Sequence, residues 1–171
     1  MNLLILGDVM GASGREALEL NLKQIIAEHK IDFTIVNGEN AADDGKGITK
    51  EITNGFFKLG VDVITSGNHI WDKSETVDLI KHETRLLRPA NLAKGSPGSG
   101  FGIFSNKDKK KIAVINLMGN VFMRKTEDAF IAARDLQQKI KLKANVDFLI
   151  VDFHGEITSE KMAIGHFFDG K

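Results

Sequence analysis

Four polar groupings in this sequence carry side chains that can bind a metal ion or transfer a proton, and each follows an apolar run. They are Asp8, Glu39 with Asn40, Asn68 with His69, and His154. Carboxylate, carboxamide and imidazole ligands together suit a hard-to-borderline metal such as Mn, Fe or Zn, and a carboxylate such as Glu39 can bridge two ions. The imidazole of His69 can carry a proton near neutral pH. These residue types predict a metal centre with a proton donor beside it.

Each of these residues also has an ordinary structural explanation when it is considered alone. Asp8 can cap the helix that follows it, Glu39 can pair with a lysine, and His154 can bond a backbone carbonyl. Asn68 and His69 can belong to a turn that begins at a glycine. Loops elsewhere in the sequence show no such concentration of ligand-type side chains, so the groupings together favour a site.

The first half of the sequence predicts alternating strands and helices that would bring these groups together. Parallel strands joined by right-handed crossovers place their carboxyl ends along one edge of a sheet, where α/β proteins bind ligands. Apolar periodicity and capping residues mark the elements, and the first strand fits a central position in its sheet. The predicted elements are a strand at Asn2–Leu6, a helix at Ser13–His29, a strand at Asp32–Val36, a helix from a Thr49 cap to about Leu59, and a strand at Val61–Thr65.

The second half predicts a hairpin and a further strand that carries His154. Asp72 and Ser74 can cap a helix that runs through Ile80. Together with the first half, these elements predict one α/β domain over residues 1–171, with a mixed sheet whose N-terminal part is parallel. The later elements are strands at Phe101–Ser105 and Lys111–Leu117 joined by the charged turn Asn106–Lys110, a helix at Glu127–Leu142, a strand at Val146–Phe153 and a helix at Ser159–Phe168.

The composition narrows the classes of partner. Lys and Arg total 23, Asp and Glu total 23, and the 171 residues include no cysteine. The balanced charge gives no sign of a surface for duplex nucleic acid or for a membrane. Without thiolates, a metal site must use oxygen and nitrogen ligands. The sequence begins directly with strand residues and shows no secretory leader, so we expect a cytoplasmic protein.

Two common nucleotide-binding patterns and one hydrolase pattern are not matched. The glycines from Gly7 to Gly14 have the spacing G-x-x-x-G-x-x-G, and Asp8 beside the first glycine would repel a pyrophosphate. No G-K-[ST] sequence of a P-loop occurs. No G-x-S-x-G nucleophile elbow occurs either. A dinucleotide-binding or serine-hydrolase site is therefore disfavoured.

A larger set of motifs is spread over nearly the whole chain. Taken together and in their order along the chain, these motifs resemble those of the bacterial YmdB-type metallophosphoesterases, a branch of the calcineurin-like superfamily. The segments are Gly7-Asp8, Asn37-Gly38-Glu39-Asn40-Ala41-Ala42, Gly45-Lys46-Gly47-Ile48-Thr49, Gly67-Asn68-His69, Trp71-Asp72, Arg88-Pro89-Ala90-Asn91, Ile115-Asn116-Leu117-Met118-Gly119 and Val151-Asp152-Phe153-His154.

The resemblance implies a calcineurin-like fold and a phosphodiesterase with two metal ions, iron or alternatively manganese, acting on 2′,3′-cyclic or 3′,5′-cyclic nucleotides. It also suggests a homo-oligomer. By motif match His69 would be the proton donor. Separately from the motifs, the backbone amides of the glycine-rich loop Ser96–Gly100 could help seat the substrate. The implied ligands are Asp8, Glu39 and Asn40 for one metal, and Glu39 as a bridge with Asn68 and His154 for the other.

The resemblance also contains a departure. Family members continue into a strand and a Gly-x-His-x-His loop that completes both metal sites, and no such loop occurs before Lys171. His166 lies in a predicted helix and does not replace it. From the sequence we therefore expect a domain that is C-terminally incomplete, with weaker metal binding. Alternative functions are a non-catalytic remnant that binds a ligand or partner, and a related phosphomonoesterase or nuclease.

Overall fold

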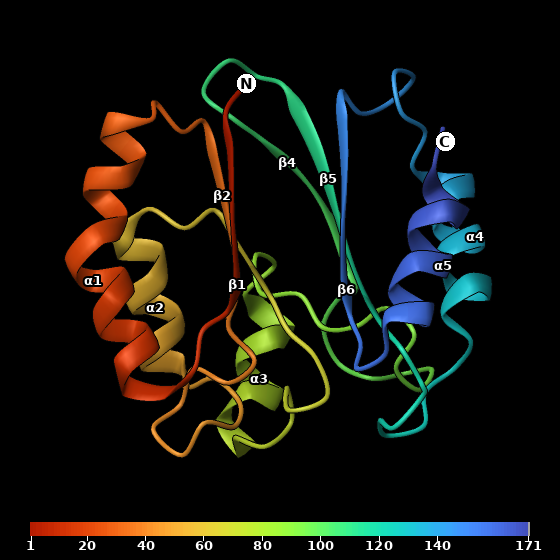
Figure 1. Ribbon diagram of the computed structural model, residues 1–171, viewed down its shortest axis with the longest axis horizontal. Helices are drawn as coiled ribbons and strands as arrows, with labels where there is room; N and C mark the ends of the chain where they lie inside the picture. Colours follow the sequence, from red (N-terminus) through yellow and green to blue (C-terminus); the bar gives the residue numbers. More distant parts are fainter. Residues whose placement is uncertain (171) are drawn as a thin grey trace.

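The computed structural model describes residues 1–170, in which two three-stranded sheets stack face to face between helices (Figure 1). Helices α1 (Gly11–Glu28) and α2 (Lys50–Leu59) cover the outer face of the first sheet. Helices α4 (Ala129–Lys139) and α5 (Thr158–Phe168) cover the outer face of the second sheet. Helix α3 (Ser74–His82) packs beside α2. The layers are therefore helix, sheet, sheet and helix.

The first sheet is parallel and has the strand order β1-β2-β3. Its strands are β1 (Leu3–Asp8), β2 (Phe33–Asn37) and β3 (Val63–Thr65). In the second sheet β4 (Phe101–Ser105) pairs antiparallel with β5 (Lys111–Met118), and β5 pairs parallel with β6 (Phe148–His154).

Alternating side chains in the central strands explain why two sheets stack. Successive strand residues point to opposite faces, and in β2 both faces are apolar. Phe33 and Ile35 meet Ile112 and Val114 of β5 between the sheets, whereas Val36 packs under the helices. Because each of these side chains is almost fully buried, each contributes about 1.5–3 kcal/mol to the free energy of folding.

Local signals at the element ends agree with the sequence. The Thr49 hydroxyl accepts a hydrogen bond of 3.2 Å from the Ile52 N–H and caps α2. In the β4–β5 turn the Asn106 carboxamide oxygen accepts from the N–H groups of Asp108 and Lys110. Most predicted elements are therefore present, with ends that differ by a few residues.

The mixed α/β class with a parallel N-terminal part is confirmed, and two details of the prediction are corrected. The strands form two stacked sheets instead of one continuous sheet. Strand β1 was expected at a central position, but it is an edge strand that pairs only with β2 among the described residues. Its Ile5 is 54% exposed as a result. None of the helices in residues 1–170 combines the length and apolar character that a membrane crossing requires.

Candidate functional site

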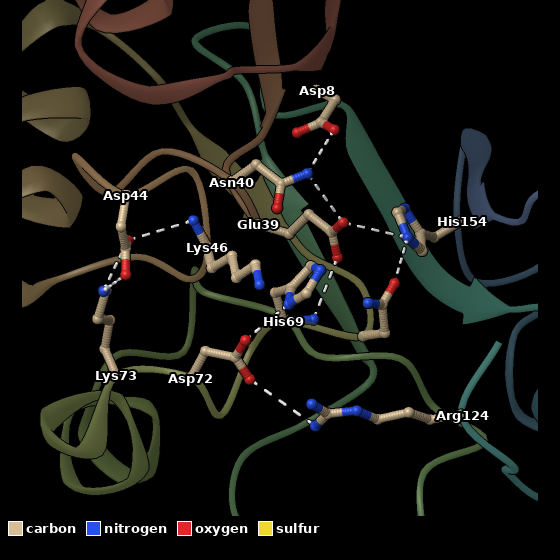
Figure 2. Close-up of polar contacts among 11 residues, drawn as sticks. Asp8, Glu39, Asn40, Asp44, Lys46, His69, Asp72, Lys73, Arg124 and His154 are labelled. Atoms are coloured by element: carbon tan, nitrogen blue, oxygen red, sulfur yellow. Dashed lines mark hydrogen bonds and ion pairs between the residues drawn. The ribbon is translucent and has the colours of Figure 1, made fainter.

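The residues predicted to form a site lie at the carboxyl ends of strands from both sheets, and Figure 2 shows Asp8, Glu39, Asn40, His69 and His154 facing one another. The first sheet contributes three strand ends and the second sheet contributes one. The residues are Asp8 at the end of β1, Glu39 and Asn40 after β2, Asn68 and His69 after β3, and His154 at the end of β6.

The Asn40 side chain connects the two carboxylates of the first sheet. The pairing register of β1 and β2 shifts between Leu6 and Asp8, and such a bulge re-aims the residue that follows it. The Asn40 Nδ2 group donates to Asp8 Oδ2 at 2.7 Å and to Glu39 Oε1 at 3.2 Å. The carboxylates of Asp8 and Glu39 are thereby held on the same side of the sheet edge.

Glu39 is the most deeply buried acid of the site, with 1% of its surface exposed. Its Oε2 accepts a weak bond of 3.4 Å from the His69 N–H, and its Oε1 lies 3.1 Å from His154 Nε2. Burial raises the pKa of this carboxyl to about 7, and the negative charge of Asp8 adds to the rise. A buried carboxylate without a full positive partner is unfavourable unless a cation binds.

His154 links Glu39 to the loop after β3. Its Nε2 lies 2.9 Å from the Asn68 Oδ1 as well as 3.1 Å from Glu39 Oε1. Burial lowers the pKa of the His154 imidazole, which favours the neutral ring, the form that binds metals. The contacts Asp8–Asn40–Glu39–His154–Asn68 therefore form one continuous chain across both sheets.

Of the alternative explanations, only the turn is present: Asn68 and His69 lie in a turn in which the Ile70 N–H donates to the Gly67 carbonyl at 3.4 Å. The other three are not supported among the described residues. Asp8 does not cap α1, because the N-cap is Met10 and no side chain bonds there. The ion-pair contact of Glu39 is with His154 and not with a lysine. The ring of His154 contacts two side-chain oxygens and no backbone carbonyl.

The donor atoms fit a metal, provided that the two asparagines take part. In the part of the chain that the structure describes, no group of three or more His, Cys, Asp or Glu side chains could hold a metal ion by itself. The Asn40 Oδ1, however, is a buried carboxamide oxygen without a hydrogen-bond partner. Leaving such an oxygen unpaired costs about 1–3 kcal/mol, and a bound cation would satisfy it. Oxygen and imidazole donors of this kind suit Mn, Fe or Zn.

The His69 ring is oriented by Asp72, for which a different role was predicted. Asp72 was predicted to cap α3, but the N-cap of that helix is Lys73. Instead the Asp72 Oδ2 lies 2.7 Å from His69 Nδ1, and its Oδ1 lies 3.7 Å from the Arg124 guanidinium. The carboxylate fixes the ring and leaves Nε2 as the nitrogen that can meet a ligand.

No role was predicted for Asn116, whose buried side chain joins the two sheets beside the site. Its Oδ1 accepts from the Ser66 N–H at 3.0 Å, and its Nδ2 donates to the Ser66 carbonyl at 3.0 Å. A second hydrogen bond between the sheets runs from Asn37 Nδ2 to Asp152 Oδ2 at 3.1 Å. The two hydrogen bonds between Asn116 and Ser66 fix the start of the loop that carries Asn68 and His69. The sequence did contain a sign of this role: Asn116 stands between Ile115 and Leu117 in an apolar strand, although asparagine is depleted in strand interiors.

Replacing Asn116 with Ala should lower the free energy of unfolding by about 2–4 kcal/mol, because the N–H and C=O of Ser66 lose their partners in a dry interface. Urea denaturation measures the change. Asn21→Ala is the matched control, since the Asn21 amide is exposed and bonds only the Ala17 carbonyl of its own helix. It should change stability by at most about 0.5 kcal/mol. Equal stability of the Asn116 variant and the native chain would contradict a role in joining the sheets.

The loop Ser96–Gly100, expected near the substrate, lies against other residues. Its glycines and Ser99 line a cavity of about 370 Å³ together with Arg88 and α4, and none of the six predicted site residues lines it. The carbonyls of Ser96 and Pro97 accept hydrogen bonds from the Arg88 guanidinium. The placement gives no support to the predicted role of this loop in binding substrate.

The stacked sheets and the carboxylate, carboxamide and imidazole groups along one edge define the architecture expected of a metallophosphoesterase. Residues 4–171 match the family model described as YmdB-like protein, so the chain belongs to the YmdB-like family.

Relatives of known name agree with this membership. Over its whole length the chain is 40% identical to the 2′,3′-cyclic-nucleotide 2′-phosphodiesterase of Bacillus subtilis, of which it covers 63%. It is 36% identical to a putative phosphatase/phosphodiesterase of Mycoplasma pneumoniae, with 98% of the chain and 59% of that protein covered. The chain therefore spans about three fifths of the length of these relatives.

Two crystal structures share the fold. A hypothetical protein from Thermus thermophilus superposes with a TM-score of 0.91 at 37% identity, covering 100% of this chain and 64% of that one. A novel phosphatase from Mycoplasma pneumoniae gives a TM-score of 0.88 at 35% identity, with 98% and 60% covered.

Proposed function

We propose that the site is that of a metal-dependent phosphodiesterase acting on 2′,3′-cyclic nucleotides. The observation that carries the proposal is the chain of contacts from Asp8 through Glu39 and His154 to Asn68, with the oriented imidazole of His69 beside it. The name of the Bacillus subtilis relative supports the choice of substrate. Hydrolysis of 3′,5′-cyclic nucleotides is a secondary expectation.

The chain's own residues divide into two sets of ligands. Asp8, Glu39 and Asn40 would hold one metal ion, and Glu39, Asn68 and His154 would hold another. Ions held there would supply Lewis acidity toward phosphate oxygens and lower the pKa of a nearby water. The unpartnered Asn40 Oδ1 and the lowered pKa of the buried His154 ring support these assignments. Iron, or alternatively manganese, is the proposed metal.

His69 is proposed to donate the proton to the leaving ribose oxygen. A general acid must lie within hydrogen-bonding reach of the group that it protonates. Asp72 holds the His69 Nδ1, so the Nε2–H of the imidazolium is the proton available for transfer. The same carboxylate stabilises the positive charge of the ring before transfer.

The Lys46 ammonium beside the site favours an anionic substrate. Lys73 and Arg15 are neutralised by Asp44 and Asp43. The Lys46 side chain, in contrast, points toward the His69 side of the site in Figure 2, and its ammonium has no polar partner among the described residues. We propose that Lys46 attracts the phosphate. The cytoplasmic location and the homo-oligomer stay predictions from the sequence.

The test of this function is hydrolysis of 2′,3′-cyclic AMP by metal-free protein before and after addition of Fe²⁺ or Mn²⁺. We expect turnover only with metal and slower turnover of 3′,5′-cyclic AMP. A chain that binds the metals yet hydrolyses neither nucleotide would favour the non-catalytic alternative. Preferred release of phosphate from a monoester would favour the phosphomonoesterase.

His69→Ala should lower kcat for 2′,3′-cyclic AMP about 10²-fold, the contribution of a positioned general acid. The loss should be much smaller for a p-nitrophenyl phosphodiester, because this leaving group departs without a proton. Asp72→Asn should give an intermediate loss, since it leaves the ring in place but removes its charge partner. The control is His82→Ala, an exposed histidine in α3. Equal losses on both substrates would contradict the assigned role.

A further inference from the structure

The segment from Gly119 to Thr126 is attached to both halves of the site. The Gly119 N–H donates to the His154 carbonyl at 2.8 Å. Five residues later the Arg124 guanidinium lies 3.7 Å from Asp72, the carboxylate that holds His69. Phe122 lies between these attachments. Since a chain extends by at most about 3.6 Å per residue, the Phe122 backbone lies within about 11 Å of the Gly119 backbone and within about 7 Å of the Arg124 backbone.

Phe122 lies in a turn closed by the Met123 N–H and the Asn120 carbonyl at 3.4 Å, but among residues 1–170 no packing contact explains the position of its side chain. Its side chain is 88% exposed, the most exposed large apolar side chain of the described residues. It belongs to none of the three apolar clusters of the fold. Its backbone has φ of 62°, a left-handed conformation that is strained for a bulky residue and that is found preferentially at ligand-binding positions.

The segment around Phe122 is fixed by hydrogen bonds. The Glu160 carboxylate of α5 accepts from the N–H groups of Asn120 at 3.0 Å and Val121 at 3.3 Å. The Asn120 Oδ1 accepts from the Thr126 N–H at 2.7 Å and from its hydroxyl at 2.9 Å. The aromatic ring is therefore presented to solvent from a held backbone and not from a free loop.

We propose that Phe122 is the platform on which the nucleobase of the substrate stacks. The inference rests on the proposed function, which places the phosphate at the His69 side of the site. An aromatic face accepts any base, because every base has a π-face and stacking requires no hydrogen-bond match. The chain would then recognise a nucleoside phosphodiester by its base at Phe122 and by its charge at the metal site and Lys46.

The test compares two substrates on the metal-loaded chain: 2′,3′-cyclic AMP and the 2′,3′-cyclic phosphate of 1-O-methylribose, which has no base. Phe122→Ala should raise KM for the nucleotide about 10-fold, a typical effect of removing one stacking partner, and leave KM for the baseless substrate unchanged. Phe122→Trp should restore the native KM. Leu20→Ala, which removes an exposed apolar side chain from α1, should change neither value.

Calorimetric binding of 2′,3′-cyclic AMP, measured in parallel, separates this inference from the proposed function. A chain without turnover but with about 10-fold weaker binding in Phe122→Ala supports the platform and rejects the catalytic function. Unchanged affinity, or no binding to the native chain, overturns the platform. A smaller molecular mass of Phe122→Ala in light scattering, with unchanged KM, would show instead that Phe122 contacts a second copy.

Discussion

Replacing Glu39 with Gln is expected to abolish metal-dependent turnover and, at the same time, to stabilise the metal-free chain at pH 8. The proposed function makes Glu39 a ligand of both ions, so the neutral amide should remove binding of at least one of them. Activity should then fall to the level of the uncatalysed reaction. No other single change at the site should remove so much function with so little change in shape.

The stability effect follows from the pKa of Glu39. Burial raises this pKa from 4.5 to about 7 in the folded chain. Between these two values the folded chain binds more protons than the unfolded chain, so its stability falls as the pH rises. The stability present below pH 4.5 is lost as the pH passes 7. A shift of this size corresponds to about 3 kcal/mol, and the amide of the glutamine variant has no such charge to bury.

Urea denaturation with chelator from pH 5 to pH 8 measures this difference. The native chain should lose stability over this range, whereas Glu39→Gln should lose about 3 kcal/mol less. Glu51→Gln, an exposed acid in the first turn of α2, is the control and should follow the native curve. If the native chain and Glu39→Gln lost stability in parallel, the buried carboxyl would not titrate as described.

Gly67→Ala should also eliminate turnover, by steric exclusion. A Cβ atom at Gly67 would overlap the Glu39 Oε2 and the ring of His154. Both side chains are held by other contacts, so either they or the loop after β3 must move. A displacement of about 1 Å in such a site is enough to cost 10²-fold in rate. We expect loss of metal binding and a decrease of about 1–3 kcal/mol in the free energy of unfolding.

Gly55→Ala is the matched control for this experiment. Gly55 lies inside α2, and a Cβ atom there would meet no atom within 4 Å. Alanine in a helix interior is more favourable than glycine by about 0.5–1 kcal/mol. The two substitutions add the same methyl group and should shift the thermal midpoint in opposite directions. Native metal content in Gly67→Ala would contradict the close approach.

The sequence predicted the elements and the strand ends well, because both depend on local patterns. Apolar runs mark the buried strands, and Thr49 marks the start of α2 through its hydroxyl. The convergence of Asp8 and Glu39 followed from parallel strand order, whereas His154 reaches them from the second sheet. The structure brings these groups into mutual contact, whereas their binding of metal stays a prediction.

The parts that could not be predicted depend on partners distant in the chain. Asp72 could be interpreted as a helix cap or as a histidine partner, and only the tertiary geometry decides in favour of His69. The division into two sheets depends on which apolar faces meet, as Ile35 and Val114 do. Strand β1 resembles a central strand because its residues are apolar, yet its second edge has no strand partner among the described residues.

The two sheets of this fold come from separate parts of the chain, residues 3–65 and 101–154, and the site lies where they meet. Any ligand held by Glu39 and His154 together is thermodynamically linked to the docking of these parts, and it stabilises the docked state by RT ln(1 + [L]/Kd). Ligand concentration would thus set the frequency with which the sheets separate. Hydrogen exchange at the Ser66 amide, which Asn116 protects across the junction, would report this opening.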